Sequence, residues 1–221
     1  MDRLHQLCGI IGVTICVSCP TFAQEAPRET PDRILGLLPN FTAVEDPDAA
    51  PPITTTAGFR MATQNSFDPA VFPFVGAVAA LAQAEDHDKP WGGGAAGYGR
   101  RFAISMADNS IGSFFTTAIA PALFHQDPRY FELREGSVLQ RVGYAASRTL
   151  VTRNRSGERQ FNYSEMAGTA AAAVISNAYY PSATHSSSDT LTRWGTQVMW
   201  DTVSNELKEF WPDIRRKLHK S

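Results

Sequence analysis

The stretch "SFDPAVFPFVGAVAALAQAEDH", Ser66 to His87, decides the fold class. Asp68 followed by Pro69 is typical of a helix N-cap and a first helical turn. The run Val71–Ala84 carries no charged residue, and its Pro73 still lies in the first turn, where proline is tolerated. We therefore predict a helix over this run.

Helical patterning continues through the rest of the chain. No segment alternates β-branched and polar residues as a half-buried strand would. We expect Pro121 to kink one helix and Pro212 to break another. The sequence therefore predicts an all-α fold, a compact bundle of about five helices with an irregular N-terminal arm. Besides Val71–Ala84, the predicted helices span about 101–124, 137–153, 164–178 and 189–210.

The chain divides into three predicted regions. Residues 1–23 have the positive start, short apolar run and small-residue end of a secretory signal peptide, with cleavage expected after Ala23. The apolar run is shorter than the roughly 20 residues of a spanning helix, although an N-terminal membrane anchor is the alternative. Residues 24–66 are rich in Pro, Asp and Thr and predict an irregular arm. Residues 67–221 form the predicted helical domain.

Cysteine usage follows from this division. All three cysteines, Cys8, Cys16 and Cys19, lie in the segment that would be removed. The mature chain would then hold no disulfide and no thiolate metal site, and packing must stabilise it.

An uncharged stretch between Asp108 and Asp127 approaches the length of a membrane span. It contains several polar residues, among them Asn109, Ser110 and Gln126. We therefore expect a buried helix there rather than a transmembrane segment.

The predicted helix 137–153 has one apolar face, which we expect to be buried. Arginines at 134, 141, 148 and 155 are spaced by seven, so they drift only about 20° per heptad around a helix. Arg141 and Arg148 fall beside the apolar face, and the outer two lie beyond the helix ends. The apolar face consists of Val138, Leu139, Val142, Ala145, Ala146, Thr149 and Leu150.

Two interpretations of Arg141 and Arg148 remain open. An arginine at the border of a buried face can lie over the core and pair with an acid on a neighbouring helix, which we favour. Alternatively, the two form an anion site for phosphate or lipid headgroups. The candidate acidic partners are Asp108, Asp127, Asp201 and Glu206.

The stretch "FHQDPRYFE", Phe124 to Glu132, holds His125, Asp127 and Arg129 close together. Asp127 before Pro128 is again cap-and-turn chemistry, so we interpret the cluster as the end of a helix. The alternative is a hydrolase that uses His125 and Asp127. We assign no catalytic residue, because the chain shows no G-x-S-x-G and no H-E-x-x-H motif.

Other ligand motifs are weak. The "GGGAAG" stretch, Gly92–Gly97, matches the dinucleotide pattern but follows an acidic loop instead of a strand, so we predict a turn or a close backbone approach and no cofactor. "EDHD", Glu85–Asp88, predicts a solvated helix end and no metal site. The net charge of −2 gives no reason to expect a nucleic-acid partner.

Six phrases occur in order along the chain, and together they resemble a family of uncharacterised exported bacterial proteins of unknown function. The resemblance covers most of the predicted mature chain and implies no activity. The phrases are "LPNF" (38–41), "SFDP" (66–69), "GYGRRF" (97–102), "QDPRYF" (126–131), "SNAYYP" (176–181) and "EFWPDI" (209–214).

Taken together, these features predict an exported cell-envelope protein with a structural or binding role. We expect it in the periplasm or outer envelope. Its partners are unknown, and a membrane surface or an envelope protein is the expected kind. The alternatives are the hydrolase described above and a peripheral membrane protein that binds anionic lipid through Arg141 and Arg148.

Overall fold

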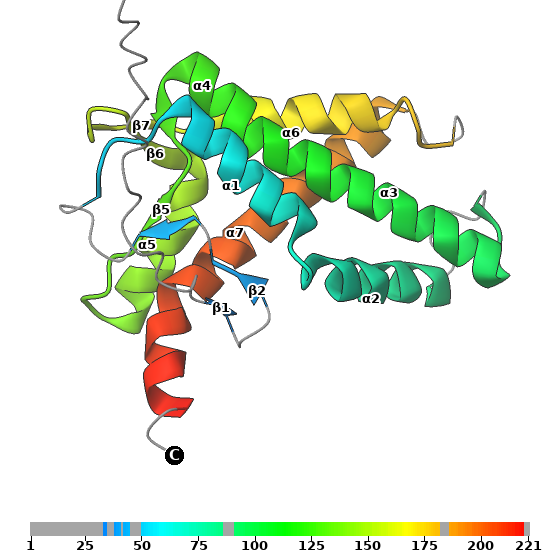
Figure 1. Cartoon of the computed structure of the whole chain (residues 1–221), viewed down its shortest axis with the longest axis horizontal. Coiled ribbons are helices and arrows are strands. Elements are labelled where there is room, and N and C mark those ends of the chain that lie inside the picture. The colour runs from blue at the N-terminus through cyan, green and yellow to red at the C-terminus, as the bar shows by residue number, and fades with distance from the viewer. Residues whose placement is uncertain are drawn as a thin grey trace, which may run out of the picture. The chain divides into compact units, whose positions relative to one another are not determined.

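Helices make up most of the structure, which confirms the predicted all-α class. The computed structural model describes residues 33–34, 38–40, 42–44, 50–85, 91–181 and 186–218. The predicted signal segment and most of the "EDHD" stretch lie outside these residues. Figure 1 shows α3 running alongside both α1 and α6, while α7 crosses between α6 and α5.

Helix α1, Thr55–Phe67, lies almost wholly in the region 24–66 that we predicted to be irregular, so the prediction is wrong for residues 55–66. Thr54 caps the helix, because its Oγ1 accepts a hydrogen bond of 3.2 Å from the Ala57 N–H. The buried face of α1 contains small residues instead of large apolar ones, which is why hydrophobic periodicity did not reveal it. These residues are Gly58, Ala62 and Ser66.

Helix α2, Val71–Ala84, has the predicted bounds. Asp68 acts differently from the prediction, since it ends α1 and the N-cap residue of α2 is Ala70. The Asp68 Oδ1 accepts a hydrogen bond of 2.9 Å from the Ala70 N–H, so it stabilises the turn between the two helices.

Helix α3, Gly94–Phe114, begins several residues before the predicted start and continues through a π-helical turn, η2, Phe115–Ile119, into α4, Ala120–Phe124. The π turn ends two residues before Pro121, and a proline removes a backbone donor from the preceding helical turn. His125 ends α4 in the left-handed conformation, with φ of 55°.

Helix α5, Val138–Leu150, starts with a capping box formed by Ser137 and Gln140. It is shorter than predicted, because the chain then enters the hairpin of β6, Val151–Asn154, and β7, Arg159–Phe161. Strand β4, Gln126–Asp127, pairs antiparallel with β6. The remaining short strands are β1, Arg33–Ile34; β2, Leu38–Pro39; β3, Ala43–Val44; and β5, Tyr130–Phe131, which pairs parallel with β3.

Helix α6, Tyr163–Ser176, is capped by Asn162 and begins one residue before the predicted start. The Asn162 Oδ1 accepts a hydrogen bond of 3.0 Å from the Glu165 N–H. The Ser164 hydroxyl is buried and donates a 2.6 Å hydrogen bond to the Gln126 Oε1, which ties α6 to β4.

Helix α7, Ser187–Leu218, passes through Pro212, so the predicted break is wrong. Proline inside a helix costs about 3 kcal/mol, and tertiary contacts must offset this. Trp211 and Pro212 are both buried. In addition, Arg141 of α5 binds Glu209 and Asp213, which stand one helical turn apart on either side of the proline.

The side of α5 that packs against α7 includes only part of the predicted apolar face. It buries Arg141 together with Ala145 and Thr149, while Val138 and Leu139 are 70% and 81% exposed. The reason is polar complementarity, because Arg141 reaches the acids of α7 and the Thr149 hydroxyl lies 2.9 Å from the Thr202 hydroxyl. Val142 and Leu150 of the predicted face are also exposed.

Candidate functional site

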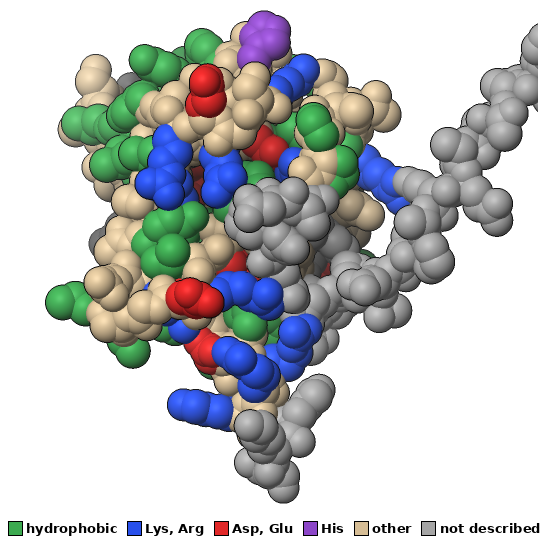
Figure 2. Space-filling model, turned by 90° about the vertical axis from the view of Figure 1, so that its left-hand side faces the viewer, with side chains coloured by type: hydrophobic (Ala, Val, Ile, Leu, Met, Phe, Trp, Pro, Cys, Tyr) green, Lys and Arg blue, Asp and Glu red, His purple; other side chains and the backbone are tan. Residues whose placement is uncertain are grey.

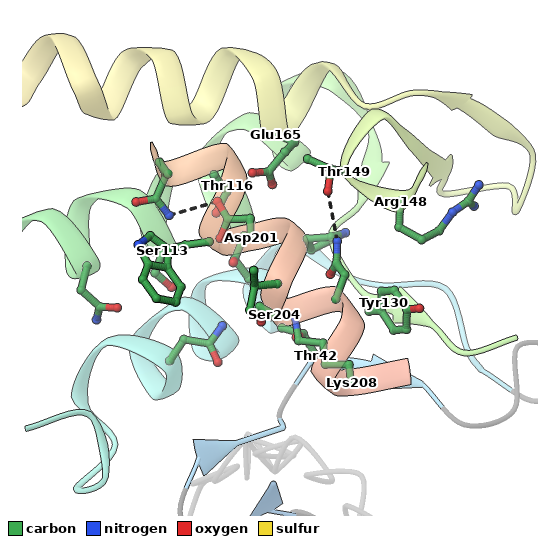
Figure 3. A pocket seen from close by; sticks show the side chains of 18 of the residues that line it. Thr42, Ser113, Thr116, Tyr130, Arg148, Thr149, Glu165, Asp201, Ser204 and Lys208 are labelled. Carbon is green, nitrogen blue, oxygen red and sulfur yellow. Dashed lines mark hydrogen bonds between the residues drawn. The ribbon is translucent and has the colours of Figure 1, made fainter. Parts of the chain in front are cut away.

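A pocket of about 620 Å³ is lined by residues of α3, η2, α6 and α7, and α2, α5 and β6 add to its walls. Figure 3 shows Glu165 reaching from α6 toward α7, close to Thr116 of η2 and Asp201 of α7. A pocket of 300–1,000 Å³ is the usual size for a small-molecule site.

Helix α7 presents a polar stripe to this pocket. Gln197, Asp201, Ser204 and Lys208 follow one another at intervals of four, three and four residues, so they share one face of the helix. The Gln197 Nε2 donates a 3.0 Å hydrogen bond to the Asp201 Oδ2 and orients that carboxylate.

Glu165 and Asp201 form a pair of carboxyl groups between α6 and α7. Burial raises the pKa of Glu165 well above its ordinary value, and the charge of Asp201 raises it further. Burial also raises the pKa of Asp201, although hydrogen bonds from Glu165 and Gln197 oppose this. The pair is therefore most stable with its proton on Glu165, in the hydrogen bond with Asp201.

Lys208 completes the polar centre of the pocket. Burial lowers the pKa of Lys208, while the charges of Asp201 and Glu165 oppose the change. With the proton of the pair on Glu165, an ionised Asp201 and a protonated Lys208 would balance in charge. This part of the pocket thus offers hydrogen-bonding groups without net charge, which suits an uncharged polar group of a ligand.

Four polar atoms in the lining are buried without a hydrogen-bond partner in the structure. They are the Asn109 Nδ2, the Glu165 Oε1 and the Nε atoms of Arg148 and Arg153. Buried donors and acceptors are nearly always satisfied in native proteins, so atoms of this kind at a pocket wall are available to a ligand or to water.

Apolar side chains from two helices form another wall of the pocket. Their side chains are partly open to solvent. The exposed fraction runs from 39% to 53% for Phe74 and Val78 of α2 and for Trp200, Val203 and Leu207 of α7. The pocket therefore combines a polar centre with an apolar side. Val78 of α2 and Trp200, Val203 and Leu207 of α7 belong to this wall.

We expect Glu165→Gln to remove a pH dependence of stability. Because the folded state holds the Glu165 proton more tightly than the unfolded state, wild-type stability falls as pH rises from about 4.5 toward the raised pKa of Glu165. The fall is at most about 1.4 kcal/mol per pH unit for one proton. The glutamine cannot ionise, so the variant should gain stability relative to the wild type over the same interval.

Urea unfolding of both proteins at a series of pH values from 4 to 8 measures this difference. Glu158→Gln in the exposed turn between β6 and β7 is the control and should leave the pH profile unchanged. If the free energies of unfolding of the wild type and Glu165→Gln changed with pH in the same way over the whole range, the raised pKa of Glu165 would be contradicted.

Arg141 shows the internal pairing that we favoured. Its Nε donates a 2.8 Å hydrogen bond to Glu209 Oε1, and its guanidinium also binds Asp213. Both acids lie on α7, and neither was among the four predicted partners. Arg148, by contrast, lines the pocket and stacks over the ring of Tyr144 at 4.6 Å.

The cluster of His125, Asp127 and Arg129 is a turn. Both Asp127 carboxylate oxygens accept hydrogen bonds from the Arg129 guanidinium, and the Arg129 backbone N–H binds one of them at 3.0 Å. His125 is exposed at the end of α4, and neither it nor Asp127 lines the large pocket. This arrangement gives no support to a hydrolase that uses these two residues.

The glycine-rich stretch, Gly92–Gly97, forms the start of α3, and its first and last residues lie close together. The Gly92 carbonyl accepts a 2.8 Å hydrogen bond from Arg101, and it leaves no room for a side chain at Gly97. Within the described ranges, no group of His, Cys, Asp and Glu residues is arranged to hold a metal ion.

Sequence reasoning missed the centre of the pocket. Asp201 was considered only as a partner for arginine, and Glu165 and Lys208 were not considered. The polar stripe on α7 is visible as a four-three-four spacing, but Glu165 reaches it from a helix more than thirty residues earlier. Only the packing of α6 on α7 joins them.

The fold and the pocket define the class: an all-α protein with a mixed polar and apolar cavity. Comparisons with protein-family models, curated proteins and solved structures found no match to this chain. Among the described helices, none is by itself long and apolar enough to cross a membrane; α1 and α2 meet that test only as a pair, bent by 53°.

Proposed function

We propose that the protein is an exported cell-envelope protein that binds a small molecule in the pocket between α6 and α7. The ligand has an uncharged polar part and an apolar part. The polar part meets Glu165, Asp201 and Lys208, and the apolar part lies along α2 and the adjoining face of α7.

The observation that carries this proposal is the pairing of a pocket of ligand size with unsatisfied buried atoms in its wall. An apolar wall with a few placed polar groups is the usual composition of small-molecule sites. Export rests on the sequence of residues 1–23, and Edman sequencing of the protein from the periplasmic fraction should find Gln24 first.

A neutral apolar dye tests the pocket. N-phenyl-1-naphthylamine should bind the wild type with one-to-one stoichiometry and an increase in its fluorescence. Ser204→Phe places a ring inside the pocket, and we expect it to weaken dye binding by about tenfold or more.

Ser187→Phe is the matched control, because Ser187 is exposed at the start of the same helix and does not line the pocket. It should bind the dye like the wild type. If Ser204→Phe bound the dye as tightly as Ser187→Phe, the dye would lie on the exposed apolar surface and the proposal would be overturned.

A further inference from the structure

Three arginines gather where α5 meets the hairpin β6–β7. Arg153 of β6 and Arg159 of β7 are direct cross-strand partners, so their side chains project from the same face of the hairpin. Arg148, from the last turn of α5, lies close enough to feel the charges of both. Arg148 and Arg153 line the pocket, and Arg159 is exposed.

No carboxylate of the described residues forms an ion pair with any of the three, in contrast to Arg129, Arg134 and Arg141. The acid nearest by strand register is Asp127, opposite Arg153 on β4, and Arg129 already occupies both of its oxygens. Like charges directly opposite one another destabilise a sheet, so an arrangement of this kind costs stability unless an anion neutralises it.

The guanidinium groups of the cluster also keep free donors. The Nε atoms of Arg148 and Arg153 are buried without a hydrogen-bond partner in the structure. Instead, the two side chains lie over aromatic rings, Arg148 over Tyr144 at 4.6 Å and Arg153 over Phe131 at 4.5 Å. The rings fix the planes of the two guanidinium groups without using their N–H donors, which preorganises them for an oxyanion.

Charge and burial act together on Arg148. Burial lowers the pKa of Arg148, and the positive charges of Arg159 and Arg153 lower it further. The negative charge of a bound anion would offset both effects, because it favours the protonated guanidinium. Figure 2 shows the side of the molecule that carries α5 and the hairpin in Figure 1, where Lys and Arg side chains and hydrophobic side chains lie among one another.

We propose that Arg148, Arg153 and Arg159 bind a phosphate-type oxyanion, the anionic group of the ligand that enters the pocket. This inference rests on the proposed function, since two of the arginines line the same pocket. Arginine is suited to the task because its planar fork donates two parallel hydrogen bonds to phosphate oxygens. The oxyanion belongs either to a soluble phosphate ester or to a phospholipid headgroup.

The neighbouring side chains are compatible with both sources. Phe161 stands two residues from Arg159 on the same face of β7 and is 46% exposed, and Leu150 at the end of α5 is 50% exposed. Apolar side chains beside a basic cluster are what a lipid headgroup and the first part of its acyl chains would contact.

Two probes at low ionic strength separate the sources. Inorganic phosphate is titrated calorimetrically, and vesicles of equal parts phosphatidylglycerol and phosphatidylcholine are compared with vesicles of phosphatidylcholine alone. Arg148→Gln with Arg159→Gln should weaken binding of whichever probe binds by about tenfold or more. Arg100→Gln removes one positive charge from α3, as Arg159→Gln alone does from β7, and should stay within about twofold of the wild type.

Phosphate binding without vesicle binding supports a soluble ligand, and binding to the phosphatidylglycerol vesicles supports a lipid. Arg159→Gln alone covers the case in which the double variant is unstable, since Arg159 is exposed and should fold normally. Absence of binding to both probes, or equal binding by the arginine variants and Arg100→Gln, overturns the inference. Dye binding blocked by Ser204→Phe would still stand in that case, so the two proposals fail separately.

Discussion

Glu209→Ala is expected to lower the free energy of unfolding by about 3–5 kcal/mol, the cost of leaving a buried charge without its partner. Glu209 is completely buried, and the side chain of Arg141 is only 9% exposed. The alanine would remove the carboxylate and leave the guanidinium in a site that water reaches poorly.

The loss extends beyond the ion pair. The Glu209 carboxylate also accepts hydrogen bonds from the Tyr130 hydroxyl at 2.8 Å and from the backbone N–H groups of Leu133 and Arg134 at 2.9 and 3.1 Å. The Tyr130 hydroxyl is buried, and leaving it without an acceptor adds about 1–3 kcal/mol, so the 3–5 kcal/mol given above is a lower estimate. The two backbone N–H groups are only partly buried and add less.

Urea unfolding followed by circular dichroism measures the effect. Glu135→Ala is the control, because Glu135 is exposed and should change stability by less than about 0.5 kcal/mol. A double-mutant cycle with Arg141→Met should give a coupling of about 0.5–3 kcal/mol. A loss below about 1 kcal/mol in Glu209→Ala would mean that this network does not form in solution.

Gly97→Ala is expected to cost about 1–3 kcal/mol, as overpacking does in a tightly packed site. A methyl group at this position would overlap the carbonyl oxygen of Gly92. That carbonyl cannot move freely, because it accepts the 2.8 Å hydrogen bond from Arg101, which is itself buried.

The neighbouring Gly99 supplies a control with the opposite sign. It lies in the same helix, and an added methyl group there would meet nothing within 4 Å. Gly99→Ala should therefore stabilise the protein by about 0.5–1 kcal/mol through the unfolded state and helix propensity. Thermal unfolding of both variants tests the pair, and a stabilising Gly97→Ala would show that the glycine is not required by the packing.

Helix prediction from the sequence succeeded where the local signal was strong. Helix α2 has its predicted bounds because the long uncharged run favours a helix and the flanking "DP" and "ED" mark its two ends. Helix α1 was missed because its buried face consists of Gly58, Ala62 and Ser66, which give no hydrophobic periodicity. Pro212 was taken as a break because the sequence does not show that Arg141 bridges the turns on both sides of it.

The polar interior also joins phrases that stand far apart in the sequence. The Tyr130 hydroxyl of "QDPRYF" donates a hydrogen bond to the Glu209 carboxylate of "EFWPDI". Both tyrosine hydroxyls of "SNAYYP", those of Tyr179 and Tyr180, donate hydrogen bonds to the carboxylate of Asp108 on α3, at 2.6 and 2.7 Å. These contacts give several of the quoted phrases a structural role.

The sequence by itself determined the helical class and the position of most helices, because these depend on spacing and charge along one segment. It favoured an internal ion pair for Arg141 but did not identify the partners. Only the tertiary structure decided which faces are buried, and it brought Glu165 to Asp201 and Lys208 and gathered Arg148 with Arg153 and Arg159. The physical reason is that this interior is joined by hydrogen bonds and ion pairs between distant segments, and such directional contacts leave no periodic trace in the sequence.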